Sequence, residues 1–177
     1  MKTSELALEL RARALVGETI ADVAYQHLRW RDGARGAHDD VELAVQLRMA
    51  SQRRFRIGWA DEFGLHHGHG ITVSEVRRVD RDAGPLEPAA WPRARIRAAT
   101  IHWKSIDDAL RNSLSIMVAI GGDHLRRADY PQTLQLDLDD GSQVFASAAR
   151  VVDGQARGFT NHLVVVFSRA ELDRLGL

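Results

Sequence analysis

Residues 41–49 read Val-Glu-Leu-Ala-Val-Gln-Leu-Arg-Met, and this stretch is the clearest strand signal in the chain. Its apolar side chains stand at five successive odd-numbered positions, with Glu42, Gln46 and Arg48 among the residues between them. Such alternation is typical of a β-strand that buries one face and exposes the other to solvent. The stretch therefore predicts a half-buried strand over 41–49.

A second alternating run follows directly after the first. Residues 54–59 read Arg-Phe-Arg-Ile-Gly-Trp, and Ser51-Gln52 lies between the two runs. A short connection between two alternating runs predicts a β-hairpin. Further strands are expected at 20–28, 71–76, 96–103, 134–138, 144–151 and 163–167. Consecutive hairpins favour antiparallel pairing of these strands.

Three helices are expected beside the strands. Apolar residues spaced by four predict an N-terminal helix over 4–16. The spacing of a capping box, in which Ser is followed three residues later by an acidic residue, begins at Ser105 and again at Ser168. The first predicts a middle helix over 106–120, whose second half could equally be a strand. The second predicts a short C-terminal helix.

Together these elements predict an α+β fold that is mostly antiparallel β-sheet, in a single domain over residues 1–177. The strand order in 17–79 is similar to that in 93–168, with one strand, an insertion, a hairpin, a loop and a last strand. One hypothesis is two pseudo-repeated four-stranded halves joined by a Pro-rich linker at 80–92. The alternative is that alternating runs in any β-rich chain can be aligned in this way.

Composition excludes several classes of protein. The chain has 177 residues, no Cys, and 24 basic against 24 acidic side chains. Without Cys there is no disulfide scaffold, zinc finger, iron–sulfur cluster or thiol nucleophile. A net charge of zero provides no global field to attract nucleic acid or anionic lipid. The apolar stretch at 116–120, which no other stretch exceeds, is far shorter than the ~20 residues that span a bilayer. With no signal-peptide pattern at the start, a cytoplasmic location is expected.

Four side chains are candidates for a surface that binds a partner protein. Arg54 and Arg56 lie on the predicted hairpin, Trp30 lies in a polar loop, and Trp91 lies among prolines, where large rings could be exposed. Arginines interleaved with aromatic residues could also stack on single-stranded nucleic acid, although the neutral charge disfavours this. The plainer interpretation is a strand with one solvated face and tryptophans in the core.

The segment 61–70 gathers imidazole and carboxylate side chains, which suit zinc, nickel or iron. If the chain is extended there, His67 and His69 project from one face, with His66 beside them. Glu75 or Glu62 would supply a further ligand. The alternative is a glycine-spaced loop with solvated histidines that holds no metal. The hypothesis of a metal ion as cofactor rests on this segment alone.

Several short motifs resemble those of β-rich single-domain bacterial proteins that are themselves uncharacterised. They are Gly-Glu-Thr-Ile at 17–20, Phe-x-Ile-x-Trp-x-x-Glu-Phe at 55–63, Gly-Ile at 70–71, Tyr-Pro-Gln-Thr at 130–133 and Leu-Val-Val-Val-Phe at 163–167. Small proteins of this kind often resemble immunity proteins, which neutralise a toxin. The resemblance implies a binding function and brings no catalytic residue with it.

Two functions are therefore expected as alternatives. The first is a non-catalytic cytoplasmic binding protein, similar to immunity proteins, that neutralises another protein by occluding it. The second is a small metal-binding protein or metal-dependent enzyme that uses His66, His67 and His69. The sequence leans away from an enzyme, because no Gly-x-Ser-x-Gly elbow or phosphate-binding loop is present.

Overall fold

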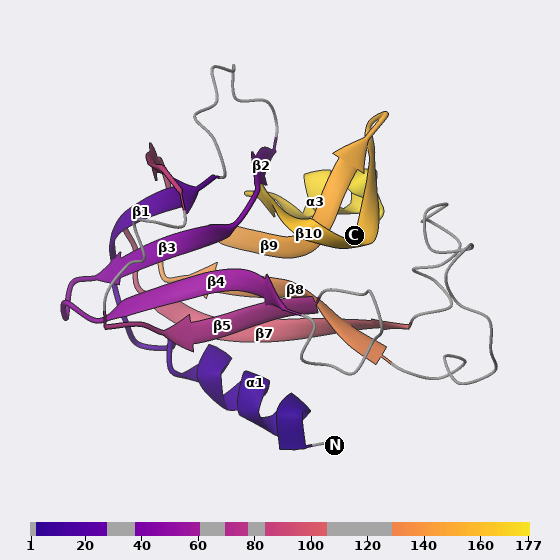
Figure 1. Cartoon of the computed structure of the whole chain (residues 1–177). Helices are drawn as coiled ribbons and strands as arrows, with labels where there is room; N and C mark the ends of the chain where they lie inside the picture. Colours follow the sequence, from indigo (N-terminus) through magenta and orange to yellow (C-terminus); the bar gives the residue numbers. More distant parts are fainter. Residues whose placement is uncertain (1–2, 28–37, 61–69, 78–83, 106–128) are drawn as a thin grey trace.

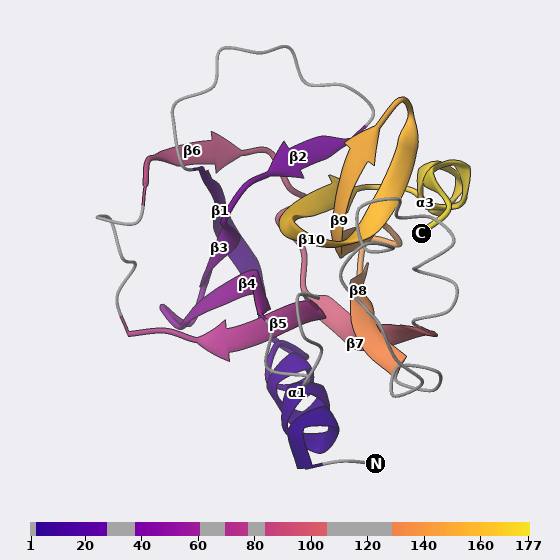
Figure 2. The same ribbon diagram turned by 45° about the vertical axis from the view of Figure 1, so that its right-hand side comes forward.

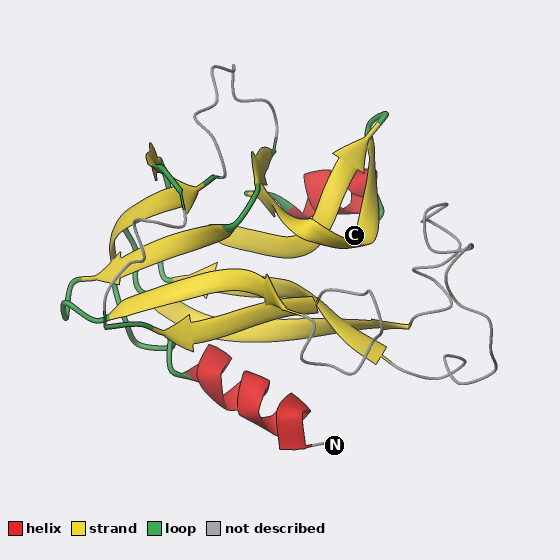
Figure 3. Ribbon diagram, viewed as in Figure 1, coloured by secondary structure: helices red, strands yellow, loops and turns green. Residues whose placement is uncertain are grey.

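A computed structural model describes residues 3–27, 38–60, 70–77, 84–105 and 129–177, and shows two β-sheets packed face to face with helices at their periphery (Figures 1 and 3). The described elements are α1 (Thr3–Arg13), β1 (Ile20–Gln26), β2 (Asp39–Val41), β3 (Ala44–Met49), β4 (Arg54–Ala60), β5 (Gly70–Glu75), β6 (Leu86–Ala89), β7 (Ile96–Ser105), β8 (Asp129–Leu138), β9 (Gln143–Val152), β10 (Gln155–Val166) and α3 (Arg169–Leu175). None of the described helices is long and apolar enough to span a membrane.

All strand pairs in the two sheets are antiparallel, as the sequence predicts. The first sheet has the order β5-β4-β3-β1-β6, and the second has the order β2-β10-β9-β8-β7. The hairpin between β3 and β4 is confirmed, with Gln52 at a φ of 70° in its turn. The mostly antiparallel α+β character is therefore confirmed.

The prediction of one strand over 41–49 is wrong, because this stretch contributes to both sheets. Val41, at the end of β2, pairs with Leu163 of β10 in the second sheet. After Glu42 and Leu43, β3 joins the first sheet. The apolar alternation continues across this break because both sheets bury side chains in the same core. A period of two does not distinguish one sheet from the other.

The main core lies between the two sheets. On the first sheet it includes Phe55 and Ile57 of β4, and on the second it includes Leu134 and Leu136 of β8. Strands β4 and β5 contact β8, β9 and β10 across this layer. At one end the sheets meet, because Thr19 forms a β-bridge with Arg95. The two halves of the sequence therefore share one core.

The outer side of β9 and β10 is buried as well. Val164 and Val166 face a second apolar cluster with Leu172 and Leu175 of α3, whereas Val165 faces the main core. Because both faces of β10 are covered here, its end carries an uninterrupted apolar run instead of an alternating one. Strand β10 begins at Gln155 and is longer than predicted. Its first residues, 155–158, escape prediction because they lack apolar alternation.

Both terminal helices are confirmed. Helix α1 packs Leu8 and Ala12 into the main core and contacts β5 and β7 (Figure 2). Helix α3 begins after Ser168, whose hydroxyl accepts a hydrogen bond from the Glu171 backbone N–H at 3.2 Å, as the capping-box spacing predicts. The predicted middle helix over 106–120 lies outside the described residues.

The Pro-rich segment 80–92 is more than a connection. Its residues Leu86–Ala89 form β6, which pairs with β1 at the edge of the first sheet. Pro88 is tolerated because an edge strand needs fewer backbone N–H donors than a central one. Each sheet also contains four neighbouring strands in chain order, β1-β3-β4-β5 and β7-β8-β9-β10, although the chain visits the second sheet as β2 between β1 and β3. The duplication of the two halves stays a prediction, since unrelated sequences also form such arrangements.

Gly158 of β10 packs closely against Tyr130 and Gln132 of β8. A Cβ at this position would lie 2.5 Å from Tyr130 Oη and 3.2 Å from Gln132 Nε2, and Tyr130 is fully buried. Overpacking a buried site typically costs ~1–3 kcal/mol. We expect Gly158→Ala to lower the free energy of unfolding by about that amount in urea denaturation.

The matched control introduces Gly158→Ala in a Tyr130→Phe background. Removing the hydroxyl removes the atom closest to the new Cβ, so the cost of the alanine should fall by about half or more. An equal cost in both backgrounds would show that the Tyr130 hydroxyl is not what requires glycine at position 158.

Candidate functional site

The outer face of the first sheet carries a ladder of polar side chains. Asp22 of β1 is paired with Arg48 of β3, which in turn is paired with Arg54 of β4. On the next rung of the same face, two residues along each strand, Gln46 of β3 is paired with Arg56 of β4. Because side chains alternate between the faces of a strand, these residues share the side opposite the core. We call this the arginine face.

A pocket opens beside the arginine face, where β1 lacks a strand neighbour. Strand β6 pairs with β1 only from Val23 to Gln26, and the next backbone contact on that side is from Ile20 N to Ala94 O at 3.1 Å. Ala21 and Asp22 therefore have no described strand partner there. The register of β1 against β3 also shifts between Ile20 and Asp22. This break in pairing, which we call the β1 gap, exposes the edge of β1.

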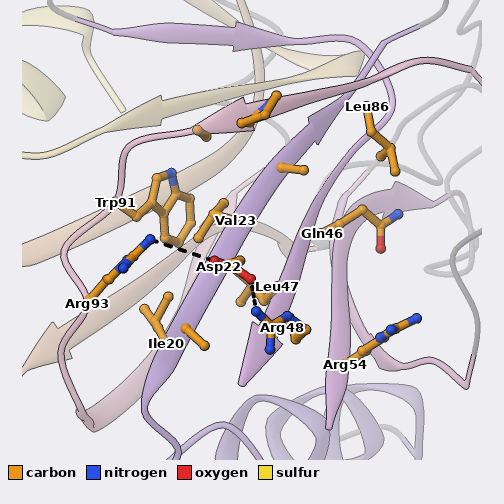
Figure 4. Close-up of a pocket in the computed structure, with 14 residues that line it drawn as sticks. Ile20, Asp22, Val23, Gln46, Leu47, Arg48, Arg54, Leu86, Trp91 and Arg93 are labelled. Carbon is orange, nitrogen blue, oxygen red and sulfur yellow. Dashed lines mark hydrogen bonds and ion pairs between the residues drawn. The ribbon is translucent and has the colours of Figure 1, made fainter. Parts of the chain in front are cut away.

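The pocket at the β1 gap has a volume of about 650 Å³ (Figure 4). Most of its wall is apolar, formed by Ile20, Ala21, Val23, Ala24, Leu47, Leu86, Pro88, Ala89 and Trp91. Its charged and polar groups are Asp22, Gln46, Arg48, Arg54 and Arg93. Ligand pockets commonly combine an apolar wall of this size with a few polar groups. The arrangement therefore suits binding of a ligand or of an anchoring side chain.

Positive charge exceeds negative charge inside this pocket. Its single carboxylate, Asp22, forms an ion pair with Arg48, and Arg93 Nη2 lies 3.8 Å from the same carboxylate (Figure 4). The side chain of Arg54 makes no hydrogen bond or ion pair with another described residue. Among the described residues that line the pocket, three guanidinium groups thus accompany one carboxylate, a formal excess of +2.

Arg56 adds a further unbalanced cation to the arginine face. Its guanidinium lies over Gly58, where a Cβ would come within 2.5 Å of Arg56 Nη1. Its one hydrogen bond to a described residue is donated by Nη2 to the Leu43 carbonyl at 3.4 Å. Burial lowers the pKa of Arg56, because a desolvated charge is disfavoured. An anion bound beside Arg56 would therefore stabilise the charged form of its guanidinium.

The pocket also contains a buried polar atom without a partner. Gln46, 7% exposed, donates a hydrogen bond from Nε2 to Gln26 Oε1 at 2.9 Å. Its own Oε1 accepts no hydrogen bond from the described residues. An unsatisfied buried acceptor typically costs ~1–3 kcal/mol. A donor supplied by a bound molecule would remove that cost.

The structure brings together two of the side chains predicted to bind a partner. Arg54 and Trp91, far apart in the sequence, line the same pocket, and Arg56 is on the adjacent rung of the sheet. Trp30 lies outside the described residues. The expectation that Trp91 is exposed is wrong, since only 7% of it is accessible.

Trp91 is buried because it joins the two sheets. Its Nε1 donates a hydrogen bond at 2.8 Å to Tyr25 Oη on β1, and that hydroxyl donates one at 2.5 Å to Asp39 Oδ2 on β2. Its ring also meets Phe167 edge to face, with 6.1 Å between ring centroids. Trp91 therefore serves as a rigid wall of the pocket and not as an exposed anchor.

Sequence reasoning missed Asp22 and Arg93, and it places Arg48 among the basic residues of the hairpin without its partner. Asp22 and Arg48 are 26 residues apart, and only the register of β1 against β3 places them together. The alternation around each residue shows that it faces solvent, but not which residue lies opposite. No local signal in the sequence could therefore have found this pair.

Of the predicted metal ligands, only Glu75 is described. His66, His67 and His69, with Glu62, lie outside the described residues. Among the parts of the chain that the structure describes, no three His, Asp or Glu side chains are grouped to hold a metal ion. Glu75 is the last residue of β5, whereas segment 61–69 precedes Gly70, the first residue of that strand. The metal hypothesis stays a prediction.

Glu75 belongs to a cluster of charges at the hairpin. Both of its carboxylate oxygens accept hydrogen bonds from Arg53, at 2.9 Å from Nε and 2.7 Å from Nη2. Arg53 Nη1 also donates to Glu18 Oε1 at 2.8 Å, and its guanidinium lies over the Phe55 ring. The hydrogen bonds from Arg53 lower the pKa of Glu75, and those to the two carboxylates raise the pKa of Arg53.

Comparisons with known proteins find no relative of this chain. No protein-family model, no curated protein and no solved structure matches it.

The ion pair between Arg53 and Glu75 determines how the Glu75 carboxyl group should titrate. Because the folded pKa of Glu75 is lowered, its stabilising contribution is complete above the ordinary pKa and is lost as the pH falls through the folded pKa. We expect the Glu75 carboxyl carbon, followed by NMR, to titrate below a normal glutamate. In Arg53→Gln the pKa of Glu75 should rise towards the ordinary range of a glutamate.

The control is Glu171, whose pKa is lowered by hydrogen bonds from Arg174 and not by Arg53, so it should stay lowered in both proteins. If Glu75 titrates at the same pH with and without Arg53, the bidentate pair does not persist in solution.

Proposed function

We propose that this chain is a non-catalytic, cytoplasmic binding protein that docks another protein on the arginine face and neutralises it by occlusion, as immunity proteins do. The observation that carries the proposal is that Arg54 and Arg56, on adjacent rungs of β4, have no carboxylate partner among the described residues. A chain with zero net charge thus concentrates unbalanced positive charge on one face.

Arginine is well suited to recognise a protein. Its planar guanidinium offers five N–H donors that match a carboxylate in bidentate geometry, and it loses less hydration energy than lysine on burial. Arginine is also enriched among the residues that dominate interface energies. The expected partner therefore presents carboxylates to this face, and complementary charge would speed association as well as fix orientation.

The sheet itself gives the face the rigidity that occlusion requires. Arg54 and Arg56 stand on β4, which is hydrogen-bonded on both sides, to β3 and to β5. Side chains on a paired strand keep their spacing better than side chains on loops, which lowers the entropy lost on binding. A prearranged set of cations is expected to bind a fixed pattern of carboxylates.

We also propose that the two halves of the chain, 17–79 and 93–168, are related by duplication. The support is the same antiparallel order of four neighbouring strands in each sheet. In that case the arginine face is a specialisation of the first half, because the second sheet covers part of its outer face with α3 instead.

The proposal is tested by capturing the partner from the native host with immobilised protein. We expect wild-type protein to retain a protein in stoichiometric amount, and Arg54→Glu to retain at least tenfold less, because a like charge replaces the attraction. Quantitative mass spectrometry of the eluate measures the ratio.

Arg97→Glu and Arg150→Glu are matched controls, since both arginines are exposed on strands of the second sheet. They should retain the partner as wild type does. Thermal unfolding of each variant shows that its fold is intact. Recovery of no stoichiometric protein, or equal loss in the controls and in Arg54→Glu, would count against the proposal.

A further inference from the structure

The pocket at the β1 gap is large enough for a small molecule. Its lining includes Val23 and Leu47, whose side chains belong to the main core on the other face, so the sheet forms the floor of the pocket. Its volume of about 650 Å³ lies in the range of ~300–1,000 Å³ that is typical of small-ligand sites.

We propose that this pocket binds a small organic anion, one acidic group attached to an apolar body, with Arg54 and Arg48 receiving the acidic group and the Trp91 side of the pocket receiving the apolar body. The inference goes beyond the proposed docking of a protein, because it assigns a ligand to a cavity that a protein partner need not enter.

Charge determines the sign of the ligand. Arg54 has no partner among the described residues, and Arg48 and Arg93 share the single carboxylate of Asp22. The ion pair between Arg48 and Asp22 involves one terminal nitrogen of Arg48, and a guanidinium has five N–H donors in all. A second carboxylate, sulfonate or phosphate can therefore be received without breaking the ion pair.

The walls determine the rest of the ligand. Pro88 of β6 is paired with Ala24 of β1, and Leu86 is paired with Gln26 one rung further along. Trp91 closes the other end of the pocket (Figure 4). Trp91 is held in place by its hydrogen bond to Tyr25 and by Phe167. A flat aromatic or aliphatic body is expected against such walls. Gln46 Oε1, which accepts no hydrogen bond from the described residues, offers one acceptor for an N–H or O–H group of the ligand.

The test uses two fluorescent probes that differ in charge. The anionic probe is 8-anilinonaphthalene-1-sulfonate, and the neutral probe is N-phenyl-1-naphthylamine, which has the same aromatic body without the sulfonate. We expect the folded wild-type protein to bind the anionic probe saturably with one site, and the neutral probe at least fivefold more weakly.

Variants locate the site. Arg54→Gln should weaken the anionic probe at least fivefold and leave the neutral probe unchanged, while Arg54→Lys should recover part of the loss because it keeps the charge. Ala24→Leu, which fills the pocket without changing its charge, should weaken both probes. The charge control is Arg150→Gln, an exposed arginine of β9, and it should bind both probes as wild type does.

A further control excludes the exposed apolar side of α1, which could attract the same dyes. Leu10 is 56% exposed there, and Leu10→Gln should leave binding of the anionic probe unchanged. The proposal is overturned if the anionic probe does not bind, if it binds no more tightly than the neutral one, if Arg54→Gln and Ala24→Leu have no effect, or if Leu10→Gln abolishes binding. Thermal unfolding of every variant shows that the proteins compared are folded.

Discussion

Burial of one apolar core between two sheets is the constraint on which the rest of this structure depends. Strands from both ends of the chain contribute to that core, and the chain passes from the second sheet to the first within residues 41–44. The inner faces take up most of the apolar side chains of the strands. On the outside, α3 covers β9 and β10, whereas the outer face of the first sheet carries polar and charged side chains. The two outer faces therefore differ, because only the part covered by α3 buries apolar side chains.

The same constraint creates the pocket. Strand β1 pairs with β6 along one part of its edge and meets residues 94–95 near its start, and the chain must turn away from β1 between the two. Trp91 fills part of the space beside β1. Its indole N–H donates a hydrogen bond to the hydroxyl of Tyr25, and that hydroxyl donates one to Asp39 in the second sheet. The contact that holds the sheets together therefore also shapes the wall of the pocket. The shape of the pocket and the packing of the two sheets are thus linked through one tryptophan.

Much of the fold can be predicted from the sequence, and less of the site. Period-two alternation locates most strands, and the spacing of Ser168 and Glu171 locates the last helix, because both are local patterns. The break after Val41 and strand β6 in the Pro-rich segment escape prediction, since neither changes the local pattern of apolar residues. Arg54 is a candidate from its alternation with aromatic residues. Its neighbours in the pocket come from pairing between distant strands, which only the three-dimensional structure provides.

We propose above all that recognition takes place on the arginine face. The most direct measurement is phenylglyoxal labelling of arginine, read by mass spectrometry, for the free protein and for the complex recovered from the native host. We expect Arg54 to be labelled in the free protein and at least fivefold more slowly in the complex, while labelling of Arg97 and Arg150 on the second sheet is unchanged. Unchanged labelling of Arg54 in the complex, with protection of Arg97 or Arg150 instead, would contradict this proposal.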